Sequence, residues 1–208
     1  MSKKLETAAL TGLMVMILFT PLVLGVDTAQ AASIYDWQSL LESTSGETTT
    51  EKLLVGIANA NLGQLAEAFE VFSSFSRQEQ GPIGEFMESQ SKVLEDSPDD
   101  LVALNVLAYG AYVTGNTARS IALLEQIIAR DPENVWPRNF VALLYGRQGD
   151  FPTGMTHLRQ ALKIEPGNQY THLLLAWGYK EQKQMVSALY HYLRSPDAIK
   201  ELKRHDVF

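Results

Sequence analysis

Four histidines are the side chains of this sequence with the most obvious potential for chemistry. They are His157, His172, His191 and His205, and they form no HExxH pair. His157 and His191 are 34 residues apart, a spacing that also recurs elsewhere in the chain. Because a metal site needs three or four convergent ligands, we expect these rings to lie in solvent or at the edge of a hydrophobic core, and we predict no metal site.

An acidic run at 95–100, Glu-Asp-Ser-Pro-Asp-Asp, is the second candidate for chemistry. It lacks the alternating oxygen ligands and the central glycine of a calcium-binding loop, and Asp99 and Asp100 complement the positive end of a helix that should follow. The chain has no cysteine and no GxSxG, Walker or dinucleotide-binding glycine motif. We therefore predict a protein that is not an enzyme and that uses no cofactor.

Composition limits the classes of partner. The chain has 208 residues, of which 46% are hydrophobic, and 17 Lys and Arg stand against 24 Asp and Glu, which gives a formal charge of −7. A chain of this length and hydrophobicity can build one ordinary core or a short array of repeats. Its negative charge argues against non-specific binding to a nucleic acid, so none is expected as a partner.

The N-terminus has the layout of a secretory signal peptide. Two lysines precede an apolar run over residues 8–26, and Ala29 and Ala31 then provide the small residues of a cleavage site. We expect cleavage after Ala31 and export to the periplasm, the cell surface or the medium. The alternative is an uncleaved membrane anchor, because the run at 8–26 approaches the ~20 residues that span hydrocarbon.

A period of 34 residues organises the rest of the chain. Pro98, Pro132 and Pro166 are spaced by 34, as are Gly115 and Gly149. Self-similarity at such a period indicates a stack of repeated units. Alignment on these anchors divides the sequence into blocks at 101–134, 135–168 and 169–196.

Small and bulky residues recur at fixed positions of the three blocks. Small ones lie at Ala108, Ala142 and Ala176 and again at Ser120, Gly154 and Ala188, and bulky ones at Leu124, Leu158 and Tyr192. This pattern resembles the tetratricopeptide repeat (TPR). The resemblance implies an all-α fold, an α-solenoid of antiparallel helix pairs with three clear repeats.

The physics of helix packing explains the pattern. Two helices can cross closely only where side chains are small, so Ala142 and Gly154 predict a contact near the backbone of both helices. Gly149 provides the turn between them, and Pro166 ends the second helix because it lacks a backbone donor. One helix pair cannot bury both faces, and stacking with its neighbours buries them.

The ends of the chain depart from the regular pattern. A degenerate repeat is expected over 49–80, opened by a capping box from Thr48 to Glu51, with an extra helix over 83–95. Lys183 replaces the expected glycine of the last repeat. The predicted organisation is a signal peptide or anchor at 1–31, an arm and linker at 32–48, a degenerate repeat and extra helix at 49–98, three repeats at 101–196, and a capping helix at 197–208.

One face of each first helix is predicted to line an inner groove. At ~100° per residue, positions 2, 5, 9 and 12 of a block point away from the partner helix. Aromatic rings beside an arginine are typical anchors of protein interfaces, and the paired amides of two blocks suggest hydrogen bonds to a ligand backbone. The predicted groove residues are Asn105, Tyr109, Tyr112, Trp136, Asn139, Leu143, Arg147, Tyr170, Leu173 and Trp177.

These features favour an exported, non-catalytic scaffold that binds a protein or peptide segment in its groove, in the assembly of the cell envelope. Repeat domains of this family that clamp acidic chaperone tails carry Lys and Asn where Asn105 and Tyr109 stand here, so that partner is not indicated. The alternative is a self-associating spacer whose groove is filled by another copy or by its own N-terminal arm, through Trp37 and Leu40. Contact with a membrane is expected only through residues 8–26, if they are retained.

Overall fold

The structure is a computed structural model that describes residues 35–205, and the predicted signal segment 1–31 lies outside them. Eleven α-helices and one short 3-10 turn follow one another in this part of the chain, which contains no strand. Among these described helices, none combines the length and the apolar character needed to cross a membrane. The predicted all-α class is confirmed.

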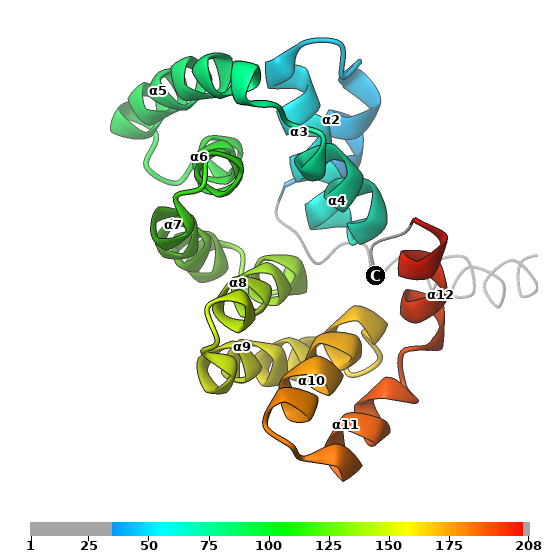
Figure 1. Cartoon of the computed structure of the whole chain (residues 1–208). Coiled ribbons are helices and arrows are strands. Elements are labelled where there is room, and N and C mark those ends of the chain that lie inside the picture. Colours follow the sequence, from blue (N-terminus) through cyan, green and yellow to red (C-terminus); the bar gives the residue numbers. More distant parts are fainter. Residues whose placement is uncertain (1–34, 206–208) are drawn as a thin grey trace, which may run out of the picture. The chain divides into compact units, whose positions relative to one another are not determined.

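The three predicted repeats are three antiparallel helix pairs (Figure 1). The first helix of each pair packs on the second helix of the pair before it, α8 on α7 and α10 on α9. This is the stacking expected of a solenoid. The pairs are α6 (Leu101–Val113) with α7 (Thr117–Arg130), α8 (Val135–Arg147) with α9 (Phe151–Ile164), and α10 (Gln169–Glu181) with α11 (Met185–Tyr192).

The 34-residue period also appears in the helix caps. Asp100, Asn134 and Asn168 begin the three first helices, and each accepts a hydrogen bond from a backbone N–H of its own first turn, at 2.8, 3.0 and 2.9 Å. Gly149 takes the left-handed backbone of the inter-helix turn, with φ of 83°, and Lys183 takes the same conformation at 59°. The last repeat therefore keeps the turn without its glycine.

The close crossing within the second repeat lies where the small residues predict it. A Cβ atom built on Gly154 would be 2.8 Å from the carbonyl oxygen of Ala142, which is shorter than real side-chain contacts. Met155 and Leu158 are buried beside this crossing. The pair Ala142 and Gly154 therefore sets how closely α8 and α9 approach.

The degenerate repeat is the pair α3 (Thr49–Leu62) and α4 (Leu65–Ser73). Its predicted capping box is present: the Glu51 N–H donates to Thr48 Oγ1 at 3.2 Å, and the Thr48 N–H donates to the Glu51 carboxylate at 3.1 Å. The preceding helix α2 (Trp37–Ser43) packs on α3, and Trp37 is buried in the main hydrophobic core.

The extra helix is α5 (Gln80–Asp96), and it changes the order of stacking. It packs on α6, so it takes the place that the second helix of a preceding repeat would occupy. The α3–α4 pair turns aside, and α3 contacts α6 and α8 across the concave side (Figure 1). The degenerate repeat thus closes the solenoid instead of lengthening it.

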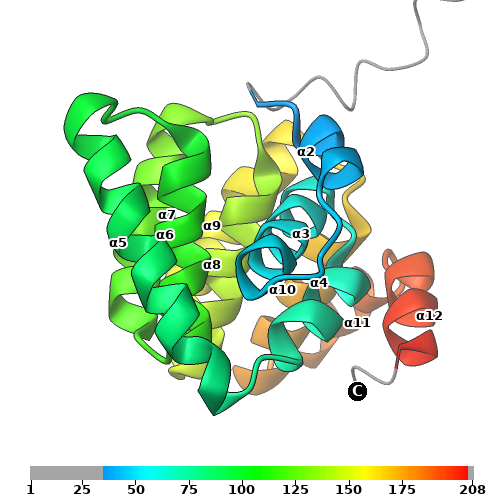
Figure 2. The same ribbon diagram turned by 90° about the horizontal axis from the view of Figure 1, so that it is seen from above.

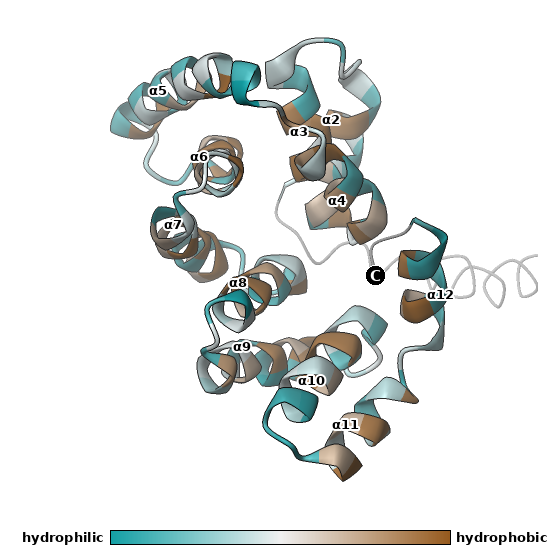
Figure 3. Cartoon of the chain, in the orientation of Figure 1, coloured by the Kyte–Doolittle hydropathy of each residue, from teal (hydrophilic) through white to brown (hydrophobic). Residues whose placement is uncertain are grey.

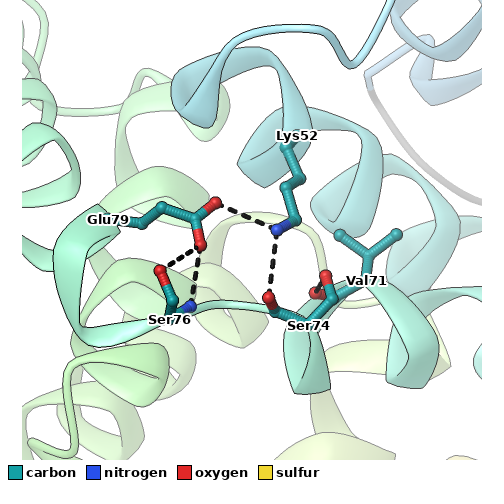
Figure 4. Close-up of polar contacts among 5 residues, drawn as sticks. All are labelled: Lys52, Val71, Ser74, Ser76 and Glu79. Carbon is teal, nitrogen blue, oxygen red and sulfur yellow. Dashed lines mark hydrogen bonds and ion pairs between the residues drawn. The ribbon is translucent and has the colours of Figure 1, made fainter.

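The connection between α4 and α5 is held by one charged cluster (Figure 4). Lys52 Nζ of α3 donates to the Ser74 carbonyl oxygen at 3.2 Å and to the Glu79 carboxylate at 2.9 Å. The same carboxylate accepts from the N–H and the hydroxyl of Ser76. These hydrogen bonds, with the Lys52 ammonium, lower the pKa of Glu79 to about 2. The cluster fixes the direction in which the chain leaves the degenerate repeat.

The capping helix is α12 (Pro196–Arg204), which packs on α10 and lies beside α4 (Figures 1 and 2). The Gln169 side chain donates to Asp197 Oδ2 and accepts from the Asp197 N–H, both at 2.8 Å. At the other end of α12, His205 Nδ1 lies 2.6 Å from Glu70 of α4. The helix therefore links the last repeat to the degenerate one.

Candidate binding cavity

The concave side of the helix stack holds a cavity of about 700 Å³. It is lined by side chains from α3, α4, α6, α8, α10, α11 and α12, most of them aromatic or aliphatic. Its volume is in the range of protein sites that hold small molecules or a few side chains of a partner. The predicted groove residues that line it are Tyr109, Tyr112, Trp136, Asn139, Leu143, Arg147, Tyr170, Leu173 and Trp177.

Helix α4 contributes a wall that the sequence analysis does not predict. Leu65, Ala68, Phe69 and Phe72 line the cavity from the side facing the regular repeats. The Phe72 ring stacks on Tyr109 with 5.2 Å between the ring centroids. An aromatic pair three residues apart on one helix is ordinary core sequence, so nothing in the local pattern distinguishes these residues from core.

Tyr109 belongs to the wall of the cavity more than to its surface. It is fully buried between Phe72 and Phe140, whose ring centroids lie 5.2 and 4.8 Å from its own. Burial raises the pKa of its phenol well above the usual range. The prediction that Tyr109 contacts a ligand directly therefore needs correction, because its neighbours leave it no free face.

Asn105 is wrongly placed by the sequence analysis. It is fully buried and does not line the cavity. Its Nδ2 donates to the Leu101 carbonyl oxygen at 2.8 Å, and its Oδ1 accepts from Asn61 Nδ2 at 2.9 Å. Its amide is therefore occupied by α3 and by its own helix, and it has no hydrogen bond left for a ligand.

Asn139, the equivalent residue one repeat later, keeps one free donor at the cavity. Its Oδ1 accepts from the Thr171 hydroxyl at 2.9 Å, while its Nδ2 is buried without a partner among the described residues. A buried N–H without an acceptor is costly. The amide nitrogen of Asn139 is thus available to a carbonyl oxygen of a bound molecule.

Two tryptophans pack against glycine backbone at the edges of the cavity. The Trp136 ring lies directly over Gly63, the left-handed residue that ends α3, so a Cβ there would collide with it. The Trp177 ring lies over Gly146 of α8, where a Cβ would be 2.6 Å from Cζ3. These contacts bring α3 against α8 and α8 against α10, and they hold both indoles in the cavity wall.

Arg147 and Lys180 are the charged side chains among the described residues that line the cavity. Arg147 Nη1 donates to the Tyr112 hydroxyl at 3.0 Å and remains exposed. Both cations come from the last turn of a first helix, so they share one edge of the cavity. An apolar pocket with two cations and no carboxylate in its lining favours an apolar ligand that carries a negative charge.

The N-terminal arm does not fill this cavity in the described part of the chain. Trp37 is buried in the main core and Leu40 packs against it, and neither lines the cavity. Deleting residues 33–48 would therefore remove core contacts whether or not the cavity is open. The form of the spacer hypothesis in which Trp37 and Leu40 occupy the groove is wrong.

The histidines lie at the edge of the core. His157 stacks on Tyr145 and His191 stacks on Tyr179, at 5.9 and 5.4 Å between centroids, as expected of equivalent positions in successive repeats. The Nδ1 atoms of His172 and His191 are 2.8 Å apart. The described residues contain no group of three or more metal-ligating side chains placed to hold an ion.

Acidification is expected to weaken the last repeat through this histidine pair. Burial lowers the pKa of both rings, that of His191 to about 4, so the unfolded chain takes up protons first as the pH falls below about 6.5. Because the pair is half-buried, we expect a loss on the order of 1 kcal/mol in the free energy of unfolding between pH 7 and pH 5. Urea titrations at both pH values should show a smaller loss in His191→Gln than in the wild type. His157→Gln is the matched control, and a loss in His191→Gln as large as in the wild type would refute the assignment.

Comparison with known proteins bears on the fold. No protein-family model matches the sequence, and no curated protein matches it. Among solved structures, one described as "Crystal structure of MamA protein" has 14% identity and a TM-score of 0.51, over 78% of this chain and 96% of that chain. Another, "Crystal structure of MamA", has 13% identity and a TM-score of 0.50, over 83% and 88%. At these identities the likeness concerns architecture alone: the chain has the α-solenoid fold of tetratricopeptide-like proteins.

Proposed function

We propose that this protein is a non-catalytic scaffold that binds a segment of another protein in its concave cavity. The observation that carries the proposal is the combination of an aromatic and aliphatic wall with two cations, Arg147 and Lys180, and no carboxylate in the lining. Aromatic anchors in desolvated pockets account for most of the binding energy of protein interfaces. The partner segment therefore presents apolar side chains to the cavity and an acidic residue to its cationic edge.

The closed shape of the cavity favours an amphipathic segment over a long extended peptide. Because α3 contacts α8, the concave side is a pocket bounded on one side and not an open trough. A helix with anchors three or four residues apart can insert two side chains into a pocket of this size. The free amide donor of Asn139 can meet a backbone carbonyl or a carboxylate of the same segment.

We also propose that the scaffold works outside the cytoplasm, in the cell envelope. This part of the proposal rests on the sequence of residues 1–31 alone. Mass spectrometry of the protein from its native host tests it, because a chain that begins at Ala32 supports export with cleavage. Recovery of the intact N-terminus in the membrane fraction would support an anchor at residues 8–26 instead.

Peptide selection with charge reversal tests the binding function. Random 12-residue peptides displayed on phage are selected against the full-length wild type and against the Arg147→Glu, Lys180→Glu double variant. We expect the wild-type peptides to carry apolar anchors and an acidic residue, and the variant to select a basic residue in place of the acidic one. A synthetic wild-type peptide should bind the variant at least ~10-fold more weakly, as expected for lost charge pairing.

Two further variants locate the site. Leu173→Glu places a carboxylate in the cavity wall and should abolish binding of the same peptide, while Lys92→Glu on the exposed side of α5 changes the net charge equally per residue and should leave binding unchanged. Circular dichroism checks that each variant keeps its helices. Selected peptides that ignore the charge reversal and Leu173→Glu would show that the cavity is not the binding site.

A further inference from the structure

Helix α11 exposes more apolar surface than any other described helix. Brown ribbon along α11 in Figure 3 marks its hydrophobic residues, and in this eight-residue helix and the residue after it six large side chains are between 46% and 87% exposed. Elsewhere in the described chain only Phe69 and Val93 are large, apolar and exposed. The six residues, called here the α11 surface, are Met185, Val186, Leu189, Tyr190, Tyr192 and Leu193.

Part of the α11 surface is open because the solenoid ends there. In the preceding repeat, Met155 and Leu158 of α9 are 1% and 3% exposed, since α10 covers them. Their equivalents 34 residues later are Leu189 and Tyr192, and both are exposed. No first helix follows α11, and α12 packs on α10. The last helix pair therefore keeps a stacking face without a partner.

The other part of the α11 surface cannot be explained by repeat geometry. Tyr190 and Leu193 correspond to Thr156 and Arg159 of α9, which are exposed polar positions on the outer side of that repeat. The architecture thus tolerates polar side chains at these positions, yet α11 carries large apolar ones. A helix that is hydrophobic on all sides is normally buried, so α11 is expected to be covered by another molecule.

We propose that the α11 surface is a homodimer interface, in which α11 of one copy packs antiparallel on α11 of a second copy about a two-fold axis near Tyr190. An isologous pairing covers the same patch on both copies, which matches a patch that has no complementary apolar surface elsewhere on the described chain. Six side chains of this size, each about half exposed, offer on the order of 600 Å² per copy. That area approaches the ~800 Å² per partner of stable interfaces.

The charges at the two ends of α11 fit this antiparallel arrangement. Glu181 and Lys183 precede the helix, Arg194 and Asp197 follow it, and all four are exposed. Antiparallel packing brings the start of one α11 to the end of the other. Glu181 of one copy then faces Arg194 of the second, and Lys183 faces Asp197, so each end pairs opposite charges.

The interface is separate enough from the cavity to be tested independently. Val186, Tyr190 and Leu193 do not line the cavity, whereas Leu173 and Arg147 do. Variants on α11 therefore report on association between copies, and cavity variants report on peptide binding. Loss of one property with the other intact tells the failure of this inference from the failure of the proposed function.

Sedimentation velocity of the full chain tests the dimer. The wild type is compared with the Val186→Glu, Leu193→Glu double variant between 1 and ~100 μM. We expect a concentration-dependent dimer in the wild type and a dissociation constant at least ~100-fold higher in the variant, because each glutamate would bury an unpaired charge. Both residues are exposed, so the variant should keep its helicity and its peptide binding.

A chain without cysteine allows a direct check of geometry. Tyr190→Cys places a single thiol near the proposed axis and should form a disulfide-linked dimer on mild oxidation, while Lys92→Cys on α5 should not. A wild type that remains monomeric at every concentration, or a double variant that associates as strongly as the wild type, would overturn the inference. So would equal crosslinking of the two cysteine variants.

Discussion

Replacing Gly154 with alanine is expected to destabilise the protein by about 3 kcal/mol, although alanine is the better helix former. The new Cβ would lie 2.8 Å from the Ala142 carbonyl oxygen, which belongs to the backbone of α8 and cannot rotate away. Relief requires α8 and α9 to separate, which loosens the packing around Met155 and Leu158. Urea unfolding followed by circular dichroism measures the change.

Gly84→Ala is the matched control for this prediction. Gly84 lies within α5, and a Cβ built on it meets no atom within 4 Å. Without a steric conflict, the gain in helix propensity should stabilise the protein by about 0.5–1 kcal/mol. Equal effects at the two positions would mean that the contact between Gly154 and Ala142 does not control the approach of the helices.

The close crossing at Gly154 shows why the repeats could be predicted from sequence. Each repeat contacts mainly the next one, so its packing requirements recur at a fixed spacing and appear as small and bulky residues 34 apart. The caps at Asp100, Asn134 and Asn168 follow the same logic, because each serves an identical helix start. A local and repeated constraint leaves a periodic trace in the sequence.

Closure of the concave side leaves no such trace. It depends on α3 reaching α8, and Asn61 and Asn134 are 73 residues apart and occur in this arrangement once. Helical periodicity places Asn105 and Tyr109 on the inner face, but it does not say that α3 and Phe72 cover that face. Nine of the predicted groove residues line the cavity because they depend only on the repeat geometry.

The exposure of α11 illustrates a different limit of sequence reasoning. Leu189 and Leu193 read as ordinary core residues of a second helix, since their spacing fits a repeat. Only the structure shows that the array ends at α11 and that α12 turns to α10. Hydrophobicity in a terminal repeat therefore has two readings, core or interface, that the pattern alone does not separate.

The asparagine cluster that closes the cavity leads to the second large effect. Asn61 Nδ2 donates to Asn105 Oδ1 at 2.9 Å and to the Ile57 carbonyl oxygen at 3.0 Å, and its Oδ1 accepts from Asn134 Nδ2 at 3.1 Å. One buried amide thus joins α3 to α6 and to the start of α8. All three asparagines are less than 9% exposed, so water cannot replace a missing partner without opening the structure.

Asn61→Ala is therefore expected to lower the free energy of unfolding by about 3 kcal/mol, because it leaves Asn105 Oδ1 and Asn134 Nδ2 buried without partners. Asn105→Ala alone should cost less, since Asn61 keeps its bonds to Ile57 and Asn134. In urea titrations the double variant should cost less than the two single changes together, by about 1 kcal/mol or more. Strict additivity would show that the two amides do not interact. Because Trp136 packs on the end of α3, Asn61→Ala should also weaken binding of the selected peptide even where the protein remains folded, whereas Gly84→Ala should not.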